Sequence, residues 1–247
     1  VPRRTDEPLR RVPDIGLAGR RRPRRVRDLA GVDLPSRARA GGRRRGRDDE
    51  PLAVALHALS RVALQPAESV AVVGVGGIGS FIVAGAAHRA PEGRVVAIDL
   101  DAQRLATAAA LGAHQTVDAS GRDLAQLLLE LTGGVGFDVV IEATGATHAP
   151  AAALAGARRG GRVLLVGLHG APRELALTPM ILREIDVFTT VAHVCDSDIP
   201  AALELLAESA VATVTAGPRI PLDELVAEGL QPLAERRATG KILVTPR

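Results

Sequence analysis

Cysteine, aromatic residues and lysine are almost absent from this chain of 247 residues, and each scarcity excludes a class of protein. The single cysteine, Cys195, cannot form an internal disulfide or supply a multi-cysteine metal site. With no tryptophan, no tyrosine and only three phenylalanines, the core must be aliphatic, and stacking of nucleic-acid bases on aromatic rings is nearly excluded. Lys241 is the only lysine, whereas arginine and alanine are abundant, which is typical of a GC-rich coding sequence.

Long apolar runs are missing as well. No stretch approaches the roughly eighteen apolar residues that a membrane-spanning helix needs. The first residues are basic but lack the apolar core of a secretory signal. We therefore expect a cytoplasmic protein without a membrane partner.

The formal net charge of +3 is unevenly distributed along the chain. Residues 1–49 contain 16 arginines against 7 acidic residues, a net charge of +9, whereas residues 50–247 have 15 basic and 21 acidic residues, a net charge of −6. The first segment, with its runs RRRPRRVR and ARAGGRRRGR, shows no helix or strand periodicity, so we expect it to be poorly ordered. Its arginines permit weak, salt-sensitive binding to nucleic acid, but the acidic remainder and the lack of aromatics disfavour such a partner.

Strand and helix patterns alternate after this segment. A largely apolar helix is expected at 51–64, ended by Pro66. Near-continuous Val, Ile and Leu runs bounded by glycines predict six strands of a parallel sheet buried on both faces. The expected strands are 69–74, 94–99, 114–119, 137–145, 161–168 and 183–193, and the helices between them are 78–90, 102–112, 123–133 and 149–160. This order predicts an α/β fold with a doubly wound, six-stranded parallel Rossmann sheet.

The tail after Cys195 falls outside the six-strand pattern, and we expect it to pack elsewhere. Its expected elements are a helix at 199–209, a strand at 211–216, a helix at 222–238 and a strand at 241–246. The predicted organisation is therefore an arginine-rich segment, residues 1–49, a nucleotide-binding domain, residues 50–195, and a C-terminal region, residues 196–247.

The most informative motif is the string VAVVGVGGIGS, a buried strand, a glycine turn and a helix start. Gly74, Gly76 and Gly79 fit the dinucleotide fingerprint: the first permits the tight turn, the second lets a pyrophosphate approach, and the third lets the helix pack on the strand. The phosphates would lie at the helix N-terminus, with Gly77 and Ile78, where free N–H groups and the helix dipole favour negative charge.

The dinucleotide motif also requires an acidic residue at the end of the next strand, and the sequence has one there. Asp99 lies twenty residues beyond Gly79, at the end of the second expected strand. There a carboxylate can accept hydrogen bonds from the adenosine ribose hydroxyls and repel a 2′-phosphate, so we expect NAD rather than NADP. Asp101 is the alternative if the strand runs two residues longer. Arg104 is a candidate to lie over the adenine, with an exposed helix arginine as the alternative.

The loops after the fourth, fifth and sixth strands should hold the nicotinamide, mainly through backbone groups. Their residues are Ala143, Thr144, Gly145, Val166, Gly167, Leu168, Val191, Ala192 and His193. His169 and His193 lie in these loops and are candidate proton carriers, although loop histidines are more often simply solvated. His57, on an apolar helix, is expected to be a satisfied core histidine.

Catalytic residues are not identified by the sequence. Cys195 lies two residues from His193, but closeness along the chain is not the geometry of a nucleophile and its base. Metal-ligand spacing is also missing, so a closed zinc site is not expected from this chain alone.

Several segments in order resemble the cofactor half of medium-chain zinc-dependent alcohol dehydrogenases. They are EPLAVALHAL, VAVVGVGGIG, VVAIDLDAQRLATAAALGA, VIEATG, GRVLLVGL and GKILVTP. The stretches EIDVFTTVAHVCDSDIPAALELLAE and IPLDELVAEGLQPLAE resemble the 2,3-butanediol and sorbitol (polyol) dehydrogenase branch. The resemblance covers residues 50–246 and implies NAD-dependent hydride transfer from a secondary alcohol, such as a vicinal diol, to give a ketone.

In that family a GroES-like β-domain supplies the catalytic zinc ligands. Residues 1–49 match no part of such a domain, and only Glu50 matches a metal-proximal position of the family. The strand at 241–246 resembles one that returns to that domain, so we expect apolar surface to be exposed there. We interpret residues 1–49 as a GC-rich stretch read out of frame or as a truncated start, which predicts a β-domain encoded upstream.

Two functions therefore stand side by side. The first is an alcohol or polyol dehydrogenase, present as its cofactor-binding part and inactive alone. The second is a non-catalytic NAD(H)-binding module. A homodimer formed through the sixth strand is expected in either case, because this strand is a candidate for an exposed edge.

Overall fold

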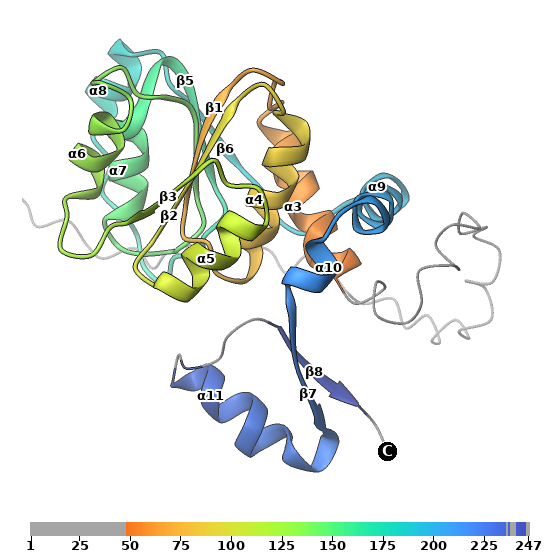
Figure 1. Cartoon of the computed structure of the whole chain (residues 1–247). Helices are drawn as coiled ribbons and strands as arrows, with labels where there is room; N and C mark the ends of the chain where they lie inside the picture. Colours follow the sequence, from red (N-terminus) through yellow and green to blue (C-terminus); the bar gives the residue numbers. More distant parts are fainter. Residues whose placement is uncertain (1–47, 236, 238–240, 246–247) are drawn as a thin grey trace, which may run out of the picture. The chain divides into compact units, whose positions relative to one another are not determined.

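The computed structural model describes residues 48–235, 237 and 241–245. The predictions made for residues 1–49 lie almost entirely outside these described residues. The main body is a sheet of six strands with helices on both faces (Figure 1). Its strands are β1 (Ser69–Val73), β2 (Arg94–Asp99), β3 (Gln115–Asp118), β4 (Phe137–Glu142), β5 (Ala157–Leu165) and β6 (Asp186–Thr189).

The predicted Rossmann sheet is confirmed. The strand order is β3-β2-β1-β4-β5-β6, and each neighbouring pair is parallel. The chain crosses from one half of the sheet to the other between β3 and β4, so the order reverses between the neighbouring strands β1 and β4. Ligands of open α/β sheets bind at the carboxyl ends of the strands beside such a reversal.

Seven helices accompany the sheet within the described residues. They are α3 (Asp49–Arg61), α4 (Gly77–Arg89), α5 (Ala102–Ala110), α6 (Leu124–Glu130), α7 (Ala149–Gly156), α8 (Leu177–Leu182) and α9 (Cys195–Glu208). Figure 1 shows α3, α4 and α5 on one face of the sheet and α6 and α7 on the other. The first helix ends at Arg61, before Pro66, because Ala63 takes a left-handed conformation with φ of 48°.

Alternate residues of each strand face two separate hydrophobic cores. Val70 and Val72 of β1 belong to the core under α3 and α4, whereas Ala71 and Val73 belong to the core under α6 and α7. This period of two follows from strand geometry, and burial on both faces explains the continuous apolar runs.

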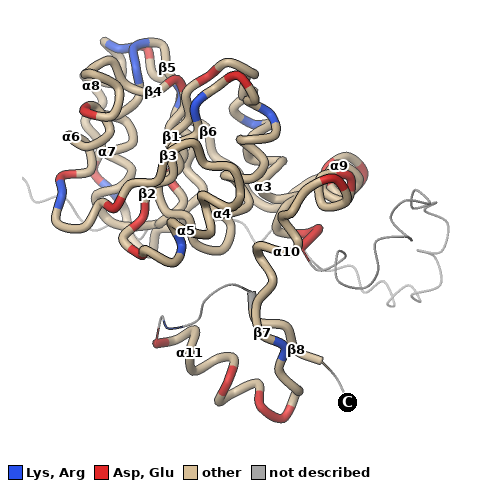
Figure 2. The backbone as a smooth tube through the Cα atoms, viewed as in Figure 1, with Lys and Arg blue, Asp and Glu red and all other residues tan. Residues whose placement is uncertain are grey.

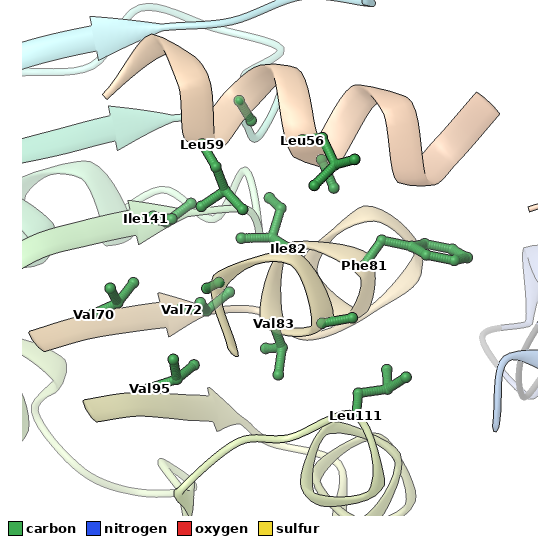
Figure 3. Close-up of a cluster of buried hydrophobic side chains, with 14 of the residues drawn as sticks. Leu56, Leu59, Val70, Val72, Phe81, Ile82, Val83, Val95, Leu111 and Ile141 are labelled. Carbon is green, nitrogen blue, oxygen red and sulfur yellow. The ribbon is translucent and has the colours of Figure 1, made fainter. Parts of the chain in front are cut away.

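Helices α3 and α4 pack closely in the first core. In Figure 3, Leu56 and Leu59 of α3 point toward Ile82 of α4. A Cβ atom on Gly85 would lie 2.8 Å from Cδ1 of Leu59, so a larger residue there would force this leucine side chain to shift. Truncation of a fully buried leucine such as Leu59 to alanine costs about 2–5 kcal/mol in cores of this kind.

Two boundaries in the second half differ from the predictions. The helix expected to reach residue 160 ends at Gly156, and β5 begins at Ala157, because the Arg183 guanidinium and the β4 strand both bind this segment in extended form. The sixth strand is shorter than expected, since the short helix α8 and a turn precede it.

The first part of the region after Cys195 packs into the core of the six-stranded sheet, whereas the tail was expected to pack elsewhere. Helix α9 contributes Ala202, Leu205 and Leu206 to the core beneath α3. The imidazole Nδ1 of His57 lies 3.1 Å from Oδ2 of Asp198 and joins the two helices, so His57 is satisfied as predicted.

The strand predicted at 211–216 is wrong. Residues Val211–Val214 form a helical turn, α10, in which Thr215 donates its hydroxyl to the Val211 carbonyl at 2.8 Å. Burial of Val211 in the core overrides the strand preference of this Val- and Thr-rich stretch.

A second, two-stranded parallel sheet joins β7 (Ala216–Pro221) to β8 (Lys241–Thr245). The connection contains a 3-10 turn (Leu222–Glu224), a π-helical stretch (Leu225–Leu230) and α11 (Gln231–Ala234). Figure 2 shows Asp and Glu residues along it. The predicted strand at 241–246 is confirmed, and the expected exposed apolar side chains are Leu222, Val226, Leu230, Leu233 and Val244. No described helix is both long and apolar enough to cross a bilayer.

Candidate functional site

The glycine turn between β1 and α4 forms the centre of the site. Gly74 has a φ of 85°, and its N–H donates to the Ile98 carbonyl of β2 at 2.8 Å. A Cβ atom on Gly79 would lie 1.9 Å from the carbonyl oxygen of Gly74, and one on Gly74 would lie 2.4 Å from Cγ2 of Thr144. Glycine is therefore required at both positions, by backbone conformation at one and by close packing at both.

The next two glycines leave the helix end open. A Cβ atom on Gly77 would have no neighbour within 4 Å, and one on Gly76 would meet only the guanidinium of Arg104, at 3.8 Å. The first intrahelical bond of α4 runs from Ser80 N–H to the Gly76 carbonyl at 3.0 Å. The three preceding N–H groups have no acceptor within the helix, so this end offers donors and a positive dipole to an anion.

Asp99 ties the end of β2 to this turn. Its Oδ2 accepts a hydrogen bond from Val75 N–H at 2.8 Å. Its Oδ1 accepts from the N–H groups of Leu100, at 2.8 Å, and Asp101, at 3.1 Å. The residue is only 9% exposed. Three backbone donors thus hold the carboxylate beside the glycine turn.

The alternative acid, Asp101, has a different task. Strand β2 ends at Asp99, and Asp101 caps α5 by accepting from the N–H groups of Gln103 and Arg104 at 2.8 and 3.0 Å. The guanidinium of Arg104 points back toward Asp99, with Nη1 3.8 Å from Oδ1. The structure therefore brings Asp99, Arg104 and the glycine turn together.

Glu142, at the end of β4, is a site residue that the sequence reasoning missed. Its Oε1 accepts from Thr144 N–H at 2.7 Å, from the Thr144 hydroxyl at 2.5 Å and from Gly145 N–H at 2.9 Å. Its backbone carbonyl accepts from Val166 and Gly167 at 2.8 and 3.0 Å. One fully buried residue therefore binds the loops after both β4 and β5. The available signal was a single acid ending an apolar strand, as at Asp99.

These bonds change what the two loops can offer a ligand. The N–H groups of Thr144, Gly145, Val166 and Gly167 are already used within the protein. The loops also touch each other, because a Cβ atom on Gly167 would lie 2.3 Å from Gly145 N. Backbone carbonyls and the exposed Leu168 are among the groups that remain available at this end of the sheet.

The two loop histidines differ in their surroundings. The His169 side chain is 16% exposed, and its Nε2 lies 3.4 Å from Oε2 of Glu142, without the alignment of a hydrogen bond. Nε2 of His193 lies 3.6 Å from Sγ of the exposed Cys195. Ala192, beside His193, has a left-handed φ of 55°. Of the two histidines, His169 is the one whose ring lies beside the newly found site residue Glu142.

A metal centre is not assembled in the described part of the chain. No three His, Cys, Asp or Glu side chains come together there as a ligand set. Glu50, which matches a metal-proximal family position, lies exposed in the first turn of α3. The described residues thus do not fit a zinc ion, whereas the glycine turn and Asp99 fit a dinucleotide.

Comparisons with known proteins identify the family. The family model for zinc-binding dehydrogenases matches residues 77–208, more than half of the chain. The chain is 31% identical over 209 residues to erythritol/L-threitol dehydrogenase of Mycolicibacterium smegmatis, covering 80% of this chain and 54% of that protein. It is 33% identical over 165 residues to sorbitol dehydrogenase of Bacillus subtilis, covering 66% of this chain and 46% of that protein.

A solved structure extends the likeness to three dimensions. The 2R,3R-butanediol dehydrogenase of Bacillus subtilis matches with a TM-score of 0.73 and 29% identity, over 81% of this chain and 57% of that one. The chain thus spans about half the length of the curated relatives that it matches.

Proposed function

The chain belongs to the zinc-binding dehydrogenase family, and we propose that it is the coenzyme-binding part of an NAD-dependent alcohol or polyol dehydrogenase. The observation that carries the proposal is the hydrogen bond from Val75 N–H to Asp99, which fixes a ribose-binding carboxylate beside the glycine turn. The likeness to dehydrogenases of erythritol, sorbitol and butanediol supports a small secondary alcohol, or the matching ketone, as substrate.

Each part of the coenzyme has proposed partners in this chain. The open end of α4 at Gly77 would take the pyrophosphate, and Asp99 with Arg104 would hold the adenosine. The loops at Thr144–Gly145 and Gly167–Leu168 and the turn at Ala192 would border the nicotinamide. When bound, NAD accepts the hydride that the alcohol carbon gives up.

Catalysis of the complete reaction is not assigned to these residues. The family name implies zinc, and the described residues do not provide its ligands. We therefore propose that this chain alone binds NAD(H) without turnover. The same observation favours the second candidate function, a non-catalytic NAD(H)-binding module in the cytoplasm.

The decisive experiment combines binding and turnover with the full chain. Isothermal titration calorimetry should detect NAD and NADH, and NADPH should bind at least tenfold more weakly because Asp99 repels the 2′-phosphate. Oxidation of sorbitol, erythritol and 2,3-butanediol is then measured with added zinc. Binding without turnover supports the module, and turnover supports a complete dehydrogenase. If neither NAD nor NADH gives a heat of binding, both candidate functions are overturned.

We also propose a homodimer that pairs the β6 edges of two copies. Strand β6 ends the sheet, and its Val187 is 39% exposed. An exposed edge strand invites pairing with a second copy. Light scattering should report twice the monomer mass, and V187K should shift it toward the monomer. A wild-type monomer at all concentrations refutes this part of the proposal.

The organisation predicted from the sequence remains part of the proposal. Residues 50–195 would bind the coenzyme, and residues 196–247 would return toward a GroES-like domain of the kind found in the family. The exposed apolar side chains around β7, β8 and α11 support an additional covering partner for this region.

A further inference from the structure

The carboxyl end of β4 holds a buried acidic side chain that the proposed coenzyme contacts do not use. The Glu142 side chain is fully buried, and its Oε2 has no hydrogen-bond partner among the described residues. A buried carboxylate oxygen without a donor is costly, and proteins rarely retain one without a purpose.

An imidazole lies beside this oxygen. Nε2 of His169 is 3.4 Å from Oε2 of Glu142, and within the described structure neither ring nitrogen has a hydrogen-bond partner. The β5 loop closes over the carboxylate, since a Cβ atom on Gly167 would lie 2.6 Å from Oε2. His169 is therefore well placed to bring an N–H donor to this oxygen through a small rotation of its ring.

The pair sits where it can control both loops. Glu142 binds Thr144 and Gly145 through its carboxylate, and it binds Val166 and Gly167 through its carbonyl. A hydrogen bond from His169 would fix the free side of that carboxylate and would join the end of the β5 loop to the β4 loop. These strands lie across the reversal of strand order from Asp99.

We propose that Glu142 and His169 are positioning residues for the nicotinamide half of the coenzyme, an inference that rests on the proposed function. Glu142 sets the spacing of the two loops, and His169 locks the carboxylate by donating an N–H group to Oε2. The pair acts through the loops, so it affects the half of the coenzyme that they border. The adenosine half, held at Asp99 and the glycine turn, is independent of it.

The test compares NADH with ADP-ribose, which lacks the nicotinamide. The variant H169L removes the ring N–H donor, and we expect NADH affinity to fall about tenfold while ADP-ribose affinity is unchanged. The variant H169Q retains an N–H donor and should restore most of the NADH affinity. The control H88L makes the same change at an exposed histidine in the last turn of α4 and should alter neither affinity.

The possible results distinguish a failure of the positioning role from a failure of the proposed function. Equal losses of NADH and ADP-ribose affinity in H169L, or no loss of either, overturn the positioning role while the proposed function stands. A wild-type chain that binds neither ligand overturns the proposed function and this inference with it. If thermal melting shows that H169L is unfolded, H169F replaces it, because its ring fills the same space without donors. The fluorescence of bound NADH provides a second readout of the nicotinamide surroundings.

Discussion

Two strand-end acids hold the two halves of the site, and they do so differently. Asp99 accepts three backbone hydrogen bonds with both of its oxygens and is largely buried, with 9% of its surface still exposed. The carboxylate of Glu142 accepts all of its side-chain hydrogen bonds with Oε1, is fully buried and has no hydrogen bond at Oε2 among the described residues.

This difference suits Asp99 to coenzyme binding and Glu142 to holding the loops in place. An acid that keeps part of its surface exposed, as Asp99 does, can organise a loop and still meet a ligand, because its oxygens can accept a further hydrogen bond from outside. A buried acid only organises the loops that cover it. We therefore expect Asp99 to matter most for coenzyme affinity and Glu142 to matter most for the shape and stability of its loops.

The largest expected effect is at the turn beside Asp99. In G79A, the new Cβ atom would lie 1.9 Å from the Gly74 carbonyl, so the turn must move. We expect a loss of about 3 kcal/mol in unfolding free energy, a melting temperature lower by about 6–12 °C, and loss of NADH binding. Urea unfolding and calorimetry measure the two effects.

The matched control for this substitution is G77A. A Cβ atom there has no neighbour within 4 Å, so the stability should stay within about 0.5 kcal/mol of the wild type. An equal loss in both variants would show that close packing at Gly79 does not govern the turn.

The two acids themselves are compared by truncation. E142A should lower the unfolding free energy by about 2–3 kcal/mol, because it leaves a cavity and removes the acceptor for Thr144 and Gly145. D99A should cost less, about 1–2 kcal/mol, because water can reach groups such as Leu100, which is 68% exposed. Urea unfolding of both variants measures the difference, and equal losses would contradict the assignment of Glu142 to support.

For coenzyme affinity we expect the opposite ranking, with substitution of Asp99 having the larger effect. D99N should weaken NADH binding about tenfold, or about 1.4 kcal/mol, and narrow the preference over NADPH, because the negative charge is lost. D101N should leave affinity unchanged, because asparagine caps α5 as well as aspartate does. Titration calorimetry of the two variants decides between the acids, and a greater loss in D101N would reverse their roles.

A third acid, Asp138, lies outside the proposed coenzyme site and can be compared with Asp99 and Glu142 for its effect on stability alone. Burial raises the pKa of Asp138, but hydrogen bonds from Ser69 and Arg158 outweigh it, so the pKa lies below its usual value. A lowered folded-state pKa means that this stabilisation is present above the unfolded-state pKa of about 4, and is lost as pH falls through the folded-state pKa.

The smallest expected effect follows from this pKa. D138N should lower the unfolding free energy by about 1 kcal/mol at pH 7 and should flatten its decline below about pH 4. Urea unfolding between pH 7 and pH 3 compares the variant with the wild type. An unchanged acid limb in D138N would mean that other carboxylates set the acid sensitivity.

The architecture was predictable because its signals are local. Apolar runs with glycine boundaries placed all six strands, and the glycine spacing with Asp99 placed the turn and its acid. Local patterns gave the wrong structure at 211–216, where burial of Val211 outweighed the strand preference. They also failed at Ala157, where contacts with β4 and Arg183 start strand β5 inside a stretch with a helical sequence pattern.

Contacts between residues far apart in the chain could not be predicted from the sequence. His57 meets Asp198 across 141 residues, and Glu142 meets His169 only because β4 and β5 are neighbours in the sheet. The acid in VIEATG was visible, but its role depends on which loops close over it. Such contacts follow from the packed structure and not from a residue's own neighbours along the chain.

The parallel pairing of β7 with β8 has a consequence for the order of folding. The nineteen residues 222–240 separate the two strands, so a short hairpin turn does not join them. During synthesis β7 leaves the ribosome well before the strand that completes it. Strand β7 can therefore pair with β8 only after residues 222–245 have been made, so this sheet forms later than β7 itself is synthesised.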